Sequence, residues 1–119
     1  MNKLILVAVL FAISTCATAS STDRVYNFVC GNQFVSDIAD YANTFLGLTV
    51  NDVPYTNGAF MGHRVIKGQA VTSAIAGNGK TNETIVALSF YEDGQVVFTM
   101  ADGPNASHPI YTAYCRSVN

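Results

Sequence analysis

The segment 84–101, TIVALSFYEDGQVVFTMA, constrains the fold more than any other part of the chain. Two apolar runs rich in β-branched and aromatic residues flank Asp93-Gly94, a dipeptide typical of a two-residue type I′ hairpin turn. With Glu92 opposite Gln95, both faces of this hairpin are largely apolar, which is typical of central strands covered on both sides. The segment therefore predicts an antiparallel sheet with at least one covering layer.

The preceding segment 31–47, GNQFVSDIADYANTFLG, is the predicted cover. Four apolar residues recur in it at helical spacing on one face: Phe34, Ile38, Ala42 and Phe45. Asn32 is a suitable N-cap, and Gly47 is a suitable end for the helix. The segment predicts the one helix of the domain.

Shorter patterns complete the element order. Alternating β-prone residues predict strands over 25–30, 63–71 and 108–116. Gly, Pro, Asn and Asp predict a loop-rich segment over 48–62, through which a short β segment could run, and a turn region over 74–81. The order is one strand, one helix and then several antiparallel strands. We therefore predict an α+β fold, with a single helix packed on an antiparallel sheet.

The first twenty residues are typical of a secretory signal peptide. Lys3 precedes an apolar run over 4–13 that is too short to span a bilayer, and Ala17-Thr18-Ala19 fits a signal-peptidase site. Cys16 could alternatively be a lipoprotein anchor, but Thr15 stands where a small residue is expected. We expect a signal peptide over 1–20 and one domain over 21–119, and hence a secreted protein.

The charge of the mature chain argues against two classes of partner. Six Lys and Arg less Lys3 leave five against eight acidic residues, a net charge of −3. No basic patch indicates capture of nucleic acid, and no basic amphipathic helix indicates a membrane surface.

Cys30 and Cys115 remain after signal cleavage, and they lie near the two ends of the domain. Because secreted proteins fold in an oxidising compartment, we expect a disulfide between them; two free buried thiols are the alternative. The same compartment makes the sequons at Asn82 and Asn105 candidate glycosylation sites.

Residues that could carry chemistry are few. His63 and His108 have no cysteine or carboxylate at a short ligand spacing, so neither a metal nor another cofactor is predicted. His63 with Arg64 could bind or process a phosphate, or could mark a solvated strand end. AGNGKT has Ala74 where a phosphate-binding loop needs glycine, so a turn is expected there.

One family resemblance emerges from Phe28-Val29-Cys30 combined with the signal peptide, the chain length and the C-terminal cysteine. In these features the chain resembles the secreted effector candidates of powdery-mildew fungi, the RNase-like proteins associated with haustoria. That family's fold is similar to the small guanyl-specific ribonucleases, with one helix on an antiparallel sheet. The hairpin over 84–101 is similar to the last hairpin of those enzymes.

The resemblance also implies where catalytic groups should lie. A base glutamate is expected within GHRVIKG, an arginine within TIVALSF and an acid histidine within 100–102, and none is present. We therefore expect a pseudo-ribonuclease rather than an enzyme.

By this resemblance, the protein is an effector and virulence factor that enters the plant cell and binds a host protein to suppress immunity. An intracellular immune receptor that recognises it as an avirulence protein is the second implied partner. RNA in a degenerate groove is a weaker candidate, and we expect a monomer.

Two other functions stay open at this stage. An active secreted ribonuclease would use His63 as base, His108 as acid and Arg64 on the phosphate. An extracellular inhibitor or sugar-binding module is the other alternative. Whatever the partner, we expect surface specificity to lie in loops such as 51–62 and 77–83.

Overall fold

The computed structural model describes residues 23–103 and 106–118, and these residues form strands joined by turns. There are nine strands in them: β1 (Arg24–Cys30), β2 (Gln33–Ala39), β3 (Phe45–Val50), β4 (Val53–Tyr55), β5 (Asn57–Ile66), β6 (Gln69–Gly77), β7 (Thr84–Tyr91), β8 (Val96–Asp102) and β9 (His108–Ser117). Within this part of the chain there is no α-helix.

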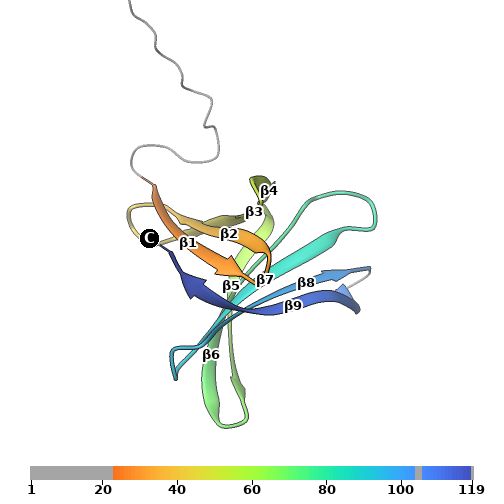
Figure 1. The fold of residues 1–119 in the computed structure, drawn as a ribbon. Helices are drawn as coiled ribbons and strands as arrows, with labels where there is room; N and C mark the ends of the chain where they lie inside the picture. The colour runs from red at the N-terminus through yellow and green to blue at the C-terminus, as the bar shows by residue number, and fades with distance from the viewer. Residues whose placement is uncertain (1–22, 104–105, 119) are drawn as a thin grey trace, which may run out of the picture.

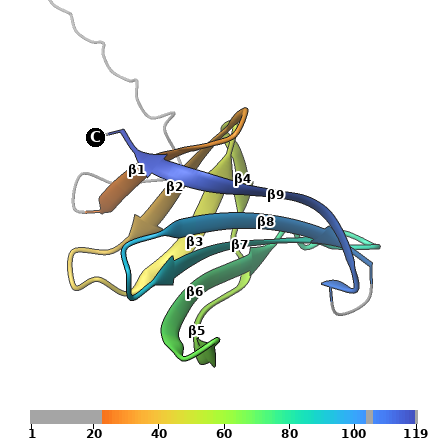
Figure 2. The ribbon, with the colours of Figure 1, turned by 60° about the horizontal axis from the view of Figure 1, so that its bottom comes forward.

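The nine strands form one antiparallel sheet in the order β4-β3-β2-β1-β9-β8-β7-β6-β5 (Figure 1). Consecutive strands pair as hairpins except β4 and β5, which are the two edges, and β1 pairs with β9, which joins the two ends of the domain. The sheet curls until β3 contacts β5 and β6, so it forms a nearly closed barrel (Figure 2). The predicted α+β, ribonuclease-like fold with one helix is therefore wrong.

The predicted helix over 31–47 is a β-hairpin made by β2 and β3. Asp40 closes the turn between them, because its Oδ1 accepts hydrogen bonds from the Ala42 and Thr44 N–H groups, each at 2.9 Å. Asn43 has a φ of 66°, which a turn of this kind requires and a helix does not tolerate. These local bonds favour a turn in the middle of the apparent helix.

Polar residues on the inner face of β2 explain why its alternation was missed. Val35 is fully buried on this face. Gln33 and Asp37, two positions before and after Val35, lie on the same face of the sheet. Gly47 does not end a helix; it lies in β3, where a Cβ would stand 2.7 Å from the Tyr55 carbonyl oxygen. The close approach of β4 therefore requires glycine at this position.

Two further segments differ from their predictions. The expected loop over 48–62 contains a type I′ turn at Asn51 and Asp52, which both have positive φ, and it contributes to three strands. The expected strand over 63–71 instead contains a second such turn, at Lys67 and Gly68. Residues 74–77 of the expected turn region continue β6.

The hairpin β7–β8 is confirmed, but its turn type and register are not as predicted. Of the residues in this turn, only Gly94 has a positive φ. The Tyr91 N–H donates to the Gln95 carbonyl, so the loop consists of the three residues 92–94. Phe98 therefore pairs with Leu88 rather than sharing a face with Ala87. The change of one residue in register moves every β8 side chain to the opposite face from the prediction.

The core fills the inside of the barrel. Its largest fully buried side chains come from both halves of the sheet: Phe98, Leu48, Leu88, Val35, Val86 and Cys30. Phe28, 8% exposed, lies in the same core and meets Phe90 edge to face at 5.9 Å between ring centroids. Phe28 and Cys30 thus share the inner face of β1, as their alternation predicts.

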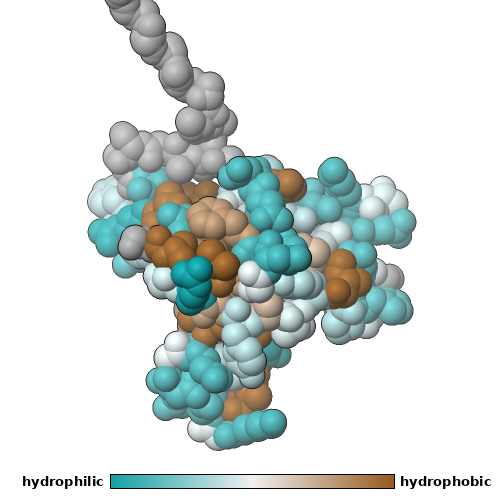
Figure 3. Space-filling model, in the orientation of Figure 1, coloured by the Kyte–Doolittle hydropathy of each residue, from teal (hydrophilic) through white to brown (hydrophobic). Residues whose placement is uncertain are grey.

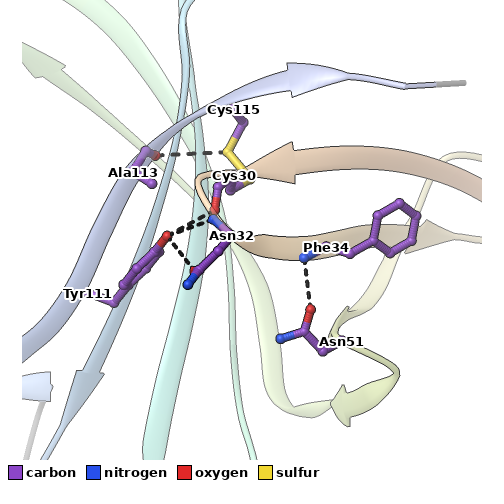
Figure 4. Close-up of a disulfide and its surroundings, with 7 residues drawn as sticks. All are labelled: Cys30, Asn32, Phe34, Asn51, Tyr111, Ala113 and Cys115. Carbon is purple, nitrogen blue, oxygen red and sulfur yellow. Dashed lines mark hydrogen bonds between the residues drawn. A yellow bond between two sulfur atoms is a disulfide. The ribbon is translucent and has the colours of Figure 1, made fainter.

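The predicted disulfide between Cys30 and Cys115 is confirmed, with sulfur atoms 2.06 Å apart (Figure 4). The two cysteines lie directly opposite one another on β1 and β9. Beside them the Tyr111 hydroxyl lies 3.0 Å from Asn32 Oδ1 and accepts a hydrogen bond from the Asn32 N–H. This network anchors the β1–β2 turn to β9.

Candidate binding surface

The residues that an active ribonuclease would use lie on different parts of the sheet. His63 and Arg64 are exposed on β5, where His63 Nδ1 lies 3.2 Å from Thr72 Oγ1, and His108 is exposed at the start of β9. The row of paired residues that begins at His63 crosses the sheet and reaches β9 at Cys115, seven residues from His108. Seven residues of strand span about 23 Å. The sheet therefore does not bring the two histidines together.

The AGNGKT segment forms a turn whose amides are already bonded. Asn78 Oδ1 accepts the Lys80 N–H at 3.1 Å, and Glu83 Oε2 accepts the Gly79 N–H at 2.6 Å. A phosphate-binding loop needs such amides free to face its ligand. The turn is therefore closed by its own side chains.

The two sequons have different outcomes. Asn82 is exposed in the turn before β7 and has a φ of 55°, so a glycan could extend from it into solvent. Asn105 lies outside the described residues.

Asp37 has the one resolved pKa shift in the described part of the chain. Partial burial on the inner face of β2 raises the pKa of its carboxyl from 3.8 to about 6, because burial penalises the charged form. It stands opposite Tyr26 and Leu48 in the neighbouring strands. Among the described residues, no cluster of three or more His, Cys, Asp or Glu side chains could hold a metal ion.

Strand β5 is an edge strand of the sheet, and β4, the strand at the other edge, does not pair with it. β5 has ten residues and pairs only with β6, whereas β4, the strand at the other edge, has three residues and pairs only with β3. A three-residue strand is too short to cover a ten-residue edge. β3 lies against part of β5 in the curled sheet, but no described strand pairs with the outward N–H and C=O groups of β5, which can therefore serve as a template for another strand.

The side chains on this edge are apolar and basic. Phe60, Met61 and Val65 are 54%, 39% and 72% exposed, and they stand beside His63 and Arg64. We call these five residues the β5 edge. Figure 3 shows apolar surface interspersed with polar surface on the hairpin β5–β6, which projects at the bottom of the view.

The charge of this hairpin differs from that of the whole chain. The segment 57–69 carries Arg64 and Lys67 and no Asp or Glu, although the mature chain has a net charge of −3. A partner segment with acidic residues would therefore complement it. The sequence signal of this hairpin is the Lys67-Gly68 dipeptide, which lies inside the single strand predicted over 63–71.

No family model, curated protein or solved structure matches this chain. No helix among the described residues is long and apolar enough to cross a membrane. The resemblance to powdery-mildew effectors thus depends on the signal peptide, the cysteine placement and the Phe28-Val29-Cys30 motif.

Proposed function

We propose that the protein is a secreted effector that binds a host protein through the β5 edge and has no ribonuclease activity of its own. The observation that carries this proposal is the ten-residue strand β5, whose second edge has no partner strand in the described residues. The signal peptide supports secretion, and the resemblance of Phe28-Val29-Cys30 supports action in the plant cell. The ribonuclease-like scaffold is not part of the proposal.

Addition of a strand is the mode of recognition that this edge favours. An extended segment of the host protein would pair with the β5 backbone, and its side chains would contact Phe60 and Val65 on the two faces. Arg64 and Lys67 favour a segment with acidic residues. Main-chain hydrogen bonds would supply affinity, while the side chains would supply specificity.

The alternative ribonuclease needs an acid and a base within hydrogen-bond reach of one substrate phosphate. Placement of His63 and His108 in separate parts of the sheet counts against a shared site. Of the two histidines, only His63 is next to Arg64. The chain has a net negative charge and no stripe of basic residues that would bind RNA. These observations support binding over cleavage.

The test compares two substitutions of equal exposure. Phe60, 54% exposed, lies on β5, and Ile110, 53% exposed, lies on β9. Tagged residues 21–119 with Phe60→Glu or Ile110→Glu would be expressed in leaves of host lines that differ in immune receptors. Bound host proteins are identified by mass spectrometry, and cell death is scored.

We expect one host protein to co-purify with the unsubstituted protein and with Ile110→Glu, and to be reduced at least about tenfold with Phe60→Glu. Cell death in a responsive line should follow the same order. Equal recovery with both variants, at equal melting temperatures, would contradict binding at β5. RNA cleavage by the purified protein that disappears in His63→Ala and in His108→Ala would establish the enzyme instead.

A further inference from the structure

A second surface lies on the outer face of β7, β8 and β9, away from the β5 edge. Ser89, Val97 and Tyr114 stand directly opposite one another on these strands, and Tyr91 follows Ser89 on the same face of β7. Two hollows adjoin here, of about 220 and about 320 Å³, and both are lined by Tyr91, Val97 and Tyr114. We call this surface the tyrosine hollow.

Polar groups surround the two tyrosines. The smaller hollow is also lined by Lys67, Gln69 and Gln95, and the larger one by Thr112. Gln69 Oε1 accepts a hydrogen bond from the Asp93 N–H at 3.2 Å, which orients its amide and leaves the NH₂ group free to donate.

Several of these groups lack a hydrogen-bond partner in the described structure. Neither tyrosine hydroxyl nor the Gln95 side chain bonds to another described residue, and Tyr114 is 71% exposed. Two aromatic rings, the unpaired amide of Gln95 and the free NH₂ group of Gln69 thus meet at one concave surface.

We propose that the tyrosine hollow binds a neutral, unbranched oligosaccharide of at least two pyranose units. The Tyr91 and Tyr114 rings are apolar bodies with polar tips, suited to the C–H faces of sugar rings and to their hydroxyls. Gln69 and Gln95 both donate and accept, as a hydroxyl-rich ligand requires. Two adjoining hollows with shared aromatic residues require a ligand of more than one ring.

The charges near the hollow select against other ligands. Lys67 is the one cation of its lining, and Arg116 lies two residues beyond Tyr114 on the same face of β9. Glu92 and Asp93 lie on the adjacent β7–β8 turn. These two cations and two carboxylates give the region no net charge, so it lacks the basic patch that a nucleic acid or an anionic sugar polymer requires. The polar lining is unsuited to a lipid tail. None of the five residues of the β5 edge lines the hollow, although Lys67 borders both surfaces, so the proposal does not depend on the proposed function.

The experiment titrates oxidised residues 21–119 with cellohexaose, chitohexaose and penta-galacturonic acid. Because the chain has no tryptophan, tyrosine fluorescence reports on the site, and calorimetry gives the affinity. The variants are Tyr114→Ala and a matched control, Tyr41→Ala, which is equally exposed at 71% but lies in the β2–β3 turn.

We expect saturable binding of at least one of the two neutral oligosaccharides, weakened about tenfold by Tyr114→Ala and unchanged by Tyr41→Ala. Phe60→Glu should bind the sugar normally, which separates this result from failure of the proposed protein interface. The proposal is overturned if neither neutral oligosaccharide binds, if galacturonic acid binds best, or if Tyr114→Ala binds as the unsubstituted protein does.

Discussion

Removal of the disulfide should destabilise this barrel strongly, because the bond joins two halves of the sheet that are paired by a ladder of only three residue pairs. β1 and β9 pair over three residues, and Cys30–Cys115 is the last of these pairs. Without it, β4-β3-β2-β1 and β9-β8-β7-β6-β5 are held together by that short ladder and by contacts across the barrel. The perturbation is the double substitution Cys30→Ala and Cys115→Ala.

The magnitude follows from the chain that the bond closes. The two cysteines are 85 residues apart, for which loop-closure entropy gives an upper figure of about 4.6 kcal/mol. Cys30 is fully buried, so loss of its sulfur adds a packing cost of about 1 kcal/mol. Because disulfides typically contribute less than this upper figure, we expect a total loss of about 4 kcal/mol, which lowers the melting temperature of a domain this size by about 15–30 °C.

Urea unfolding at pH 7 would compare the oxidised protein, the reduced protein and the double variant. The reduced protein isolates the cross-link, since it keeps both sulfur atoms in the core. We expect reduced protein and double variant to unfold at similar, much lower urea concentrations than the oxidised protein. Equal midpoints for oxidised and reduced protein would refute the reasoning.

Two other predictions concern ionised side chains. Because burial raises the pKa of Asp37 from 3.8 to about 6, the folded protein binds this proton more tightly than the unfolded chain. This contribution to stability is present below about pH 4 and is lost as the pH rises to about 6. The substitution Asp37→Asn should therefore abolish the decline and stabilise the protein at pH 7. If the urea midpoints of the variant fall with pH as steeply as those of the unsubstituted protein, the prediction is wrong. Glu83→Ala should cost about 1–2 kcal/mol, because the Gly79 N–H loses its carboxylate acceptor, and an unchanged unfolding free energy would show that the turn needs no such bond.

The strands that sequence patterns predicted correctly are those whose inner face is uniformly apolar. Val86 and Leu88 on β7 alternate regularly, as do Phe28 and Cys30 on β1, and the structure buries all four. β2 was missed because its inner face includes the polar side chain of Asp37, so the helical period of its other apolar residues matched better. Contacts with β1 and β3, distant in the local pattern, override that period.

The candidate surfaces were less predictable than the strands. The sequence singles out His63 and Arg64 as groups that could act on a phosphate. Only the structure shows that they lie on an edge strand, where they can contact an added strand. Tyr91 and Tyr114 lie 23 positions apart in the chain and meet only because β8 places Val97 between them. No local pattern contains this relation.

The sequence by itself determined the cross-link between Cys30 and Cys115 and the position of the central hairpin. Each depends on residues whose chemistry is local or whose pairing has no competitor in the mature chain. The tertiary structure decided the curling of the sheet, the register of β8 and the edge left open at β5. These depend on turn geometry and on pairing between distant strands, where one residue of register exchanges the inner and outer faces.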